Sequence, residues 1–379
     1  MGYITVLPTL TKRQFSRHIP NDKENLFPSP FQLFNNGRAA LWAGLSLLNL
    51  RPEDEILVPA TICEVVLQTI FHSGVSVHYY NLLPDLDVDL DDLKKRVNSK
   101  TRAVYVNHYL GKASTIEPIR NLCDAARIKL IEDCAHGFTG AQNGKLLGTT
   151  GDITIFSYRK FLPLPDGGGL VINDKTLSRN EFILGNYPAK KPILDALKLG
   201  VQSLAQRGIV PLQFLKSIRS NNIDDYLCAD DKIELENRDQ PRKLQWLSQW
   251  GLSHADLKFM QLERKKNYAA LNKCVKALSN VEPLFSIFPA DSVPYSYPFR
   301  IKGRAKLIRF AAKYGLYLEP TLAPPYQSLP NLVNADEKFP IVEEIAQEIV
   351  SAPVHQSLDL KNMSSVQDIL QRGLEEQFG

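Results

Sequence analysis

The chain has 379 residues, of which 45 are Lys or Arg and 41 are Asp or Glu, so its net charge is only +4. Because charges of both signs are interspersed, the sequence argues against a nucleic-acid binder that works through a basic surface field. Apolar residues make up 44% and charged residues 23%, a balance that excludes disorder as the main state. The length favours two or three structural units.

The cysteines and the first residues of the chain indicate the cellular compartment of the protein. No two cysteines have the close spacing of a zinc or redox motif, so we expect free thiols in a reducing cytosol. The first residues lack the pattern of a signal peptide, and no window reaches the ~18 apolar residues that a membrane helix needs. An aspartate-rich run over 85–92 lacks the Gly and Glu spacing of a calcium loop. We therefore expect a cytoplasmic protein with no metal site and no membrane partner. The cysteines are Cys63, Cys123, Cys134, Cys228 and Cys274.

From Gly37 to residue 172, short apolar runs alternate with helical stretches. Such alternation predicts βαβ units and a mainly parallel sheet, with the last two runs as neighbouring strands. The predicted strands cover 55–58, 75–80, 103–106, 129–131, 153–158 and 169–172, and the predicted helices cover 38–50, 64–72, 89–98 and 116–127.

The remainder of the chain follows a different pattern. Prolines break residues 1–35, and residues 175–245 are mostly helical with an acidic stretch over 221–239. A long amphipathic helix is predicted over 256–278, then a strand over 297–301, a Pro-rich loop over 320–330, and helices over 305–314, 341–348 and from 364. The sequence thus predicts an arm (1–35), a large α/β domain (36–245), a connecting helix (246–280) and a small α+β domain (281–379).

The segment Lys129-Leu-Ile-Glu-Asp-Cys-Ala-His136 is a predicted buried strand that ends in two carboxylates and is followed by a histidine. Ligands of open α/β sheets bind at the carboxyl ends of the strands. A buried Asp133 should persist only with a positive or proton-donating partner, whether a ligand, a helix end or a core arginine.

A second predicted strand leads directly into Ser157-Tyr-Arg-Lys160. A lysine at the mouth of a sheet, near a buried carboxylate and a hydroxyl, suits pyridoxal phosphate chemistry. The amine forms a Schiff base, the carboxylate keeps the pyridine nitrogen protonated, and the hydroxyl holds the phosphate. A solvated basic residue in a turn is the alternative for Lys160.

A glycine precedes the helix start in Asn35-Asn-Gly-Arg-Ala-Ala-Leu41. Backbone N–H groups at such a start can receive a phosphate, aided by the helix dipole. An ordinary turn into a helix is equally consistent with this segment alone.

With these motifs in order, the chain resembles the DegT-type, vitamin-B6-dependent sugar aminotransferases of fold type I. Further matching segments are spread over nearly the whole chain, and Ser351-Ala-Pro-Val-His355 resembles the family's late Leu-Pro-x-His segment. The others are Pro52–Pro59, Lys100–Val104, Asn107–Gly111, Gly144–Gly148, Gly151-Asp152, Phe156-Ser157 and Gly167-Gly168.

The resemblance implies a seven-stranded, mainly parallel mixed sheet with a small C-terminal domain, and it implies pyridoxal 5'-phosphate as cofactor. Asp133 would contact the pyridine nitrogen, His136 would lie beside the ring, and Lys160 would form the Schiff base. Ser157 would bind phosphate together with Gly37 and the backbone of Arg38 and Ala39. The implied reaction transfers an amino group from an amino acid such as glutamate to a keto-sugar, carried on a nucleotide.

Three departures from the family pattern stand out. Ser157 and Lys160 are two residues closer than in the family, and Cys63 stands where many members place an aromatic over the cofactor. The family's Asn-x-Arg segment before the long helix is replaced by Leu247-Ser-Gln-Trp250. Another pyridoxal phosphate reaction, or a regulatory homologue with reduced catalysis, is therefore the alternative function.

Two further expectations concern contacts. His108, within Asn107-His-Tyr, either contacts substrate or lies hydrogen-bonded in the core. Fold type I resemblance implies a homodimer, and Trp246 and Trp250 in an otherwise polar segment suit an interface. The alternative is that both tryptophans pack on their own domain.

Overall fold

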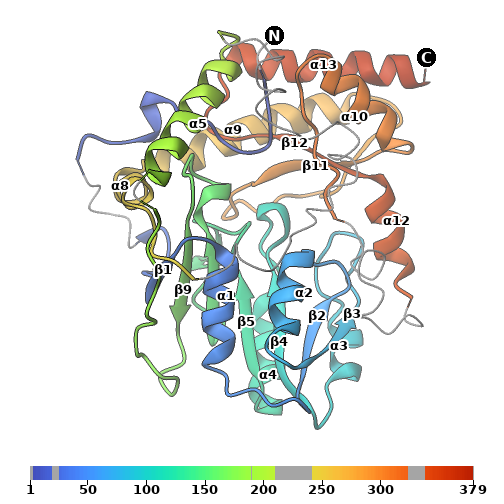
Figure 1. Cartoon of the computed structure of the whole chain (residues 1–379). Helices are drawn as coiled ribbons and strands as arrows, with labels where there is room; N and C mark the ends of the chain where they lie inside the picture. The colour runs from blue at the N-terminus through green and yellow to red at the C-terminus, as the bar shows by residue number, and fades with distance from the viewer. Residues whose placement is uncertain (1–2, 19–24, 189, 210–240, 323–337, 379) are drawn as a thin grey trace.

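The computed structural model describes residues 3–18, 25–188, 190–209, 241–322 and 338–378 (Figure 1). Two bodies share this part of the chain. The larger is built on a seven-stranded sheet, and the smaller is built on a three-stranded sheet.

The large sheet has the strand order β1-β9-β8-β5-β4-β2-β3. Its strands from β8 to β3 are mutually parallel, and only β9 runs antiparallel to its two neighbours. Apart from edge strands β1 and β3, these strands are almost wholly buried, as expected for a parallel sheet built from the predicted βαβ units. The bounds are β1 Gln32–Phe34, β2 Glu55–Pro59, β3 Ser76–Tyr80, β4 Thr101–Asn107, β5 Lys129–Asp133, β8 Ile153–Ser157 and β9 Gly168–Ile172.

Helices connect these strands, and the first of them is α1 (Gly37–Ser46). It packs on β8 and β9, where Gly44 is so close that an added Cβ would lie 2.7 Å from Ile153 Cδ1. The other helices of this half are α2 (Glu64–Phe71), α3 (Leu90–Arg96) and α4 (Ile116–Ala126), and a short β6–β7 hairpin spans Ala141–Leu146.

The small body has the antiparallel sheet order β10-β11-β12, with its helices packed around it. It lies above the upper edge of the large sheet in Figure 1. Its elements are β10 (Glu282–Pro283), β11 (Ser296–Arg300), α10 (Arg304–Lys313), α12 (Pro340–Glu348), β12 (Ile349–Pro353) and α13 (Leu360–Phe378). The predicted α/β fold with a smaller α+β unit is confirmed.

Two boundaries differ from the predicted ones. The arm 1–35 includes β1, which joins the large sheet at the edge of β9. The span 246–280 is two helices, α8 (Trp246–His254) and α9 (Leu257–Lys276), because Asp256 caps α9 by accepting a hydrogen bond from the Phe259 N–H.

Helix α5 (Lys191–Gln206) lies in the predicted helical stretch. The acidic stretch 221–239 and most of the Pro-rich loop 320–330 lie outside the described residues. No helix among those described is long and apolar enough to span a bilayer.

Candidate active site

Asp133 and Ser157 end two neighbouring parallel strands, β5 and β8, at the same edge of the large sheet. Each side chain is buried, with 7% of its residue surface exposed. Lys160 follows Ser157 in a single 3-10 turn, and His136 follows Asp133. The chain order of the two motifs therefore brings the predicted residues to one edge of the sheet, as the rule for open α/β sheets anticipates.

The carboxylate of Asp133 is held by two donors. The Tyr105 hydroxyl donates to Oδ2 over 2.6 Å, and the Ala135 N–H donates to Oδ1 over 2.7 Å. Burial, and then the Asp133 charge, raise the pKa of Tyr105 well above its ordinary value, so this hydroxyl stays a donor. Both donors fix the carboxylate in place at the end of β5.

The N-terminus of α1 lies directly against the end of β8. Asn36 caps the helix by accepting a hydrogen bond from the Ala39 N–H at 2.9 Å. A Cβ added at Gly37 would lie 3.3 Å from the Phe156 carbonyl oxygen and 3.5 Å from Ser157 Cβ. Gly168 on β9 is tighter still, because its added Cβ would lie 2.1 Å from the Asn36 oxygen. Glycines thus allow the first turn of α1 and the Ser157 side chain to share one small space.

The amine of Lys160 lies 2.8 Å from Nε2 of His136. The His136 ring stacks on Tyr295, with centroids 4.3 Å apart and planes 9° from parallel. Burial, and then the charge of Lys160, lower the pKa of His136 well below its ordinary value. A neutral imidazole is therefore the acceptor for the lysine amine, and Tyr295 from the small body supports that ring.

Arg264 of α9 has no exposed surface, and its hydrogen bonds connect the turn at Lys160 to the segment around Tyr295. Its guanidinium donates to the carbonyls of Pro294 and Tyr295 at 3.1 and 3.0 Å, and to Phe161 at 3.3 Å. It also donates to the Lys160 carbonyl at 3.4 Å. Among the described residues it forms no ion pair, and burial lowers its pKa to about 9. Arg264 is therefore a core residue that joins α9 to the turn at Lys160.

Cys63 is exposed and immediately precedes α2. It is close enough to Tyr105 for its charge to contribute to the raised pKa of that phenol. The residue therefore lies near the Tyr105–Asp133 pair, where the family resemblance places a cofactor contact. Arg38 and Ala39 occupy the first turn of α1, beside Gly37.

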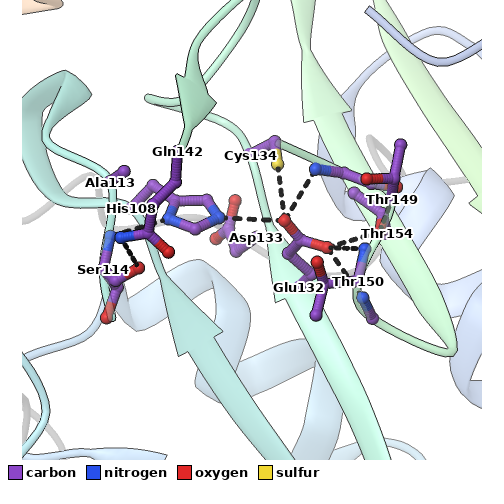
Figure 2. Close-up of polar contacts among 12 residues, drawn as sticks. His108, Ala113, Ser114, Glu132, Asp133, Cys134, Gln142, Thr149, Thr150 and Thr154 are labelled. Atoms are coloured by element: carbon purple, nitrogen blue, oxygen red, sulfur yellow. Dashed lines mark hydrogen bonds and ion pairs between the residues drawn. The ribbon is translucent and has the colours of Figure 1, made fainter. Parts of the chain in front are cut away.

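Glu132, next to Asp133 on β5, is fully buried and points to the opposite side of the strand (Figure 2). Its Oε1 accepts hydrogen bonds from His108 Nε2 at 3.0 Å and the Gly148 N–H at 2.6 Å. Its Oε2 accepts from the N–H groups of Thr150 and Gly151 at 3.0 and 2.7 Å. Burial alone would raise the pKa of Glu132, but these hydrogen bonds, led by His108, lower it. One carboxylate thus ties β4, β5 and the loop before β8 together.

His108 has no role at the mouth of the site in this structure. Its Nε2 faces Glu132, its Nδ1 accepts the Ser114 N–H at 3.0 Å, and its side chain is completely buried. This is the geometry of the core alternative and leaves no ring nitrogen for a substrate. Cys134 lies near the same carboxylate, with Sγ 3.8 Å from Oε1. Burial, and then nearby Glu132, raise the pKa of Cys134 well above its usual value, and the side chains of His108, Glu132 and Cys134 form one buried cluster.

Sequence reasoning missed Tyr105, Tyr295 and Glu319 as neighbours of the site. Tyr105 lies on β4, one strand away from Asp133, and could have been found from the alternation of side chains in adjacent parallel strands. Tyr295 and Glu319 come from the small body, more than 130 residues beyond Lys160. No local sequence signal indicates a contact of that range.

Solved structures with a similar fold include sugar aminotransferases. The fold matches the aminotransferase PseC of Helicobacter pylori with a TM-score of 0.71 and 17% identity, over 99% of this chain and 100% of that one. It matches a putative sugar aminotransferase of Streptococcus pneumoniae, solved in a PLP-form, with a TM-score of 0.70 and 17% identity over the full length of both chains. These likenesses establish the fold class.

Sequence comparison gives a partial family match. Residues 33–198 match the model of the DegT/DnrJ/EryC1/StrS aminotransferase family. GDP-perosamine synthase of Vibrio cholerae is 34% identical over 145 residues, which is 38% of this chain and 40% of the relative. A dTDP-4-dehydro-2,3,6-trideoxy-D-glucose 4-aminotransferase of Saccharopolyspora spinosa is 23% identical over 379 residues, covering 96% of this chain and 88% of that protein. The match to the perosamine synthase thus spans about two fifths of its length.

Proposed function

We propose that this protein is a pyridoxal phosphate-dependent aminotransferase that moves an amino group from an amino acid such as glutamate to a nucleotide-linked keto-sugar. One observation carries the proposal. A lysine amine, a buried carboxylate and a glycine-lined helix start converge at the ends of β5 and β8. The named activities of the relatives, which act on GDP- and dTDP-linked sugars, support the substrate class.

The residues present fit this cofactor. A phosphate would bind where the first turn of α1 meets Ser157, because Gly37 and Gly168 allow the helix N-terminus to lie directly against the ends of β8 and β9. The Asp133 carboxylate, fixed by Tyr105 and Ala135, would hold the pyridine nitrogen. Lys160 is the amine within this set. The bound group would supply an electrophilic aldehyde and an electron-withdrawing ring.

The chain's own groups then have separate tasks. Asp133 would keep a proton on the ring nitrogen, and Ser157 with the backbone of α1 would orient the phosphate. Nζ of Lys160 would be the base that takes a proton from the substrate carbon and returns it. His136 stays neutral and accepts a hydrogen bond from that amine, so it positions the amine without taking its proton.

Absorbance of the purified protein, followed by borohydride reduction and peptide mapping, tests the proposal. A near-visible band and a label on the peptide Phe156–Phe161 are expected, and Lys160→Met should lose both. A label on another lysine would contradict the assignment of Lys160. A protein that neither absorbs nor takes the label after incubation with cofactor would favour the regulatory homologue.

We further infer that the active unit is a homodimer, which the family resemblance implies. Trp246 has 63% of its surface exposed and Trp250 has 46%. Such exposure fits a subunit interface better than packing on their own domain. Trp250 also stacks on His254, and its ring centroid lies 5.4 Å from that of Phe15, so its own chain covers part of it.

We place the protein in the cytoplasm, because the cysteines in the described ranges are free. We expect no nucleic-acid partner, because the net charge is small.

A further inference from the structure

Arg264 of α9 directs its three guanidinium nitrogens at three separate segments of the chain. Nη2 donates to the carbonyls of Lys160 and Phe161 at 3.4 and 3.3 Å. Nη1 donates to two successive carbonyls, the second of them that of Tyr295, just before β11. Nε donates to Oε1 of Gln356, just after β12, at 2.9 Å. One side chain therefore joins the turn at Lys160 to two segments of the small body.

Gln356 reaches the same turn from the other side. Its side chain is buried, and its Nε2 donates to the Phe161 carbonyl at 2.7 Å, the oxygen that also accepts from Nη2 of Arg264. Cζ of Arg264 lies 4.5 Å from the centroid of the Phe161 ring. Asn267, one turn further along α9, donates to the two carbonyls that precede Gln356 at 3.3 and 3.2 Å. The end of the turn is therefore held by groups from α9 and from the segment after β12.

Arg264 occupies this position at an energetic cost. It has no exposed surface, and the hydrogen bonds described above all end on neutral oxygens. Well-packed apolar residues in place of a buried charged network often stabilise a protein, so packing alone does not account for an arginine here. Buried charged groups of this kind are concentrated at functional sites.

The two backbone segments that Arg264 joins carry the two side chains that contact His136. Nζ of Lys160 lies 2.8 Å from Nε2 of His136, and the Tyr295 ring stacks on the imidazole with centroids 4.3 Å apart. Nζ also lies 5.9 Å from the centroid of the Tyr295 ring. The guanidinium therefore fixes, at the backbone, the same two residues that meet at His136. A displacement of either backbone would change the separation between the amine and the imidazole.

We propose that Arg264 is a positioning residue for the Lys160 amine, whose 2.8 Å contact with His136 it sets. It does so by fixing the backbone of Lys160 and of Tyr295 together. A lysine at position 264 could not do the same, because an ammonium is a point charge whereas the guanidinium is a planar fork of donors. A misplacement of about 1 Å can slow a reaction about 100-fold. The use of this contact in catalysis rests on the proposed function, whereas the contact itself does not.

The test is ¹⁵N NMR of the full chain, cleared of cofactor and labelled with ¹⁵N-histidine. The signal of His136 Nε2, assigned by its loss in His136→Gln, shows whether that nitrogen accepts a hydrogen bond. The signal should shift downfield in Arg264→Lys, because the ammonium cannot hold the three segments together and the Lys160 amine moves away from the ring. Gln356→Leu should give a smaller shift in the same direction, since it leaves the guanidinium in place.

Arg300→Ala is the matched control. Arg300 pairs with Glu344 and Glu348 in the same small body, so its loss weakens that body without removing a contact to the turn at Lys160. The His136 signal should therefore stay in place. When pyridoxal phosphate is added, Arg264→Lys should form the near-visible band about 10- to 100-fold more slowly than Arg300→Ala.

An unshifted His136 signal in both Arg264→Lys and Gln356→Leu, with native circular dichroism, would overturn the proposal, as would an equal shift in Arg300→Ala. If Arg264→Lys does not fold, Gln356→Leu decides in the same assay. A shifted signal in these variants, together with an unsubstituted protein that never forms the near-visible band, would keep this inference and refute the proposed function.

Discussion

The amine of Lys160 and Nε2 of His136 are 2.8 Å apart, and the imidazole stacks on the ring of Tyr295. Because the amine donates to Nε2, the ring proton must be on Nδ1.

We predict that Lys160→Met raises the pKa of His136 but leaves it below 6.5, because burial is the larger cause of its depression and the lysine charge the smaller. Side-chain ¹⁵N NMR between pH 5 and 8 measures this. In the unmodified protein the signal should be that of a neutral ring throughout the range. An unchanged titration in Lys160→Met would show that the lysine charge does not reach the ring.

Asp133→Asn should leave the fold intact and slow the reaction roughly 100-fold or more. The amide cannot keep a proton on a ring nitrogen, and its NH₂ group would face one of the two donors that now bind the carboxylate. Stopped-flow spectroscopy with an amino donor measures the rate. Tyr105→Phe is the matched control, since it removes one donor and keeps the anion, and its loss should be much smaller. Equal turnover in Asp133→Asn and the parent would return Asp133 to a structural role.

Gly168→Ala should weaken binding of inorganic phosphate and destabilise the fold by about 1–3 kcal/mol. The new Cβ would lie 2.1 Å from the Asn36 oxygen and 2.8 Å from the Gly37 nitrogen, so the start of α1 must move. Calorimetric titration with phosphate and urea unfolding measure the two effects. Gly200→Ala in α5 is the control: its Cβ meets nothing within 4 Å, and it should gain up to about 1 kcal/mol. Similar phosphate affinity in Gly168→Ala would move the anion site elsewhere.

Acid should weaken the protein through His355, whose pKa is lowered to about 3 by burial and by nearby Arg264. The unfolded chain binds a proton here below about pH 6.5, whereas the folded chain does not until about pH 3. Stability is therefore fully present above about pH 6.5 and declines toward pH 3, by up to about 1.4 kcal/mol per pH unit from this group. Urea unfolding at pH 7.5 and 5.5 should show a smaller drop in His355→Gln, and an equal drop would contradict the assignment.

Light scattering at low micromolar concentration should give twice the 42.7 kDa mass of one chain. Trp246→Glu should shift the population toward the monomer, because it places a charge where we propose an apolar contact. Leu360→Glu on α13, a residue 75% exposed and distant in sequence, is the control and should leave the mass unchanged. A monomer with full cofactor occupancy would show that the site is complete within one chain.

Much of the framework is predictable because strands buried on both faces have a strong local signature. Strands β2, β3, β4, β5, β8 and β9 and helices α1 to α4 fall within a few residues of their predicted bounds, whereas the two-residue strands β6 and β7 have no counterpart among the predicted elements. The short strand β1 escapes prediction, since three residues carry no periodicity. The opposite orientations of Glu132 and Asp133 follow from strand alternation, but the partners of Glu132 come from a loop 16 to 19 residues away. Contacts of Lys160 with the small body depend on packing over more than 130 residues and have no sequence signature.

The guanidinium of Arg264 donates hydrogen bonds to carbonyls of both bodies. Its Nε also donates to Oε1 of Gln356 at 2.9 Å. These hydrogen bonds tie the turn at Lys160 to the small body, so a tilt of the three-stranded sheet over the larger one would strain them. A shorter segment between serine and lysine is tolerable under that arrangement, because the anchor of the turn lies in α9 and not in the length of the turn itself.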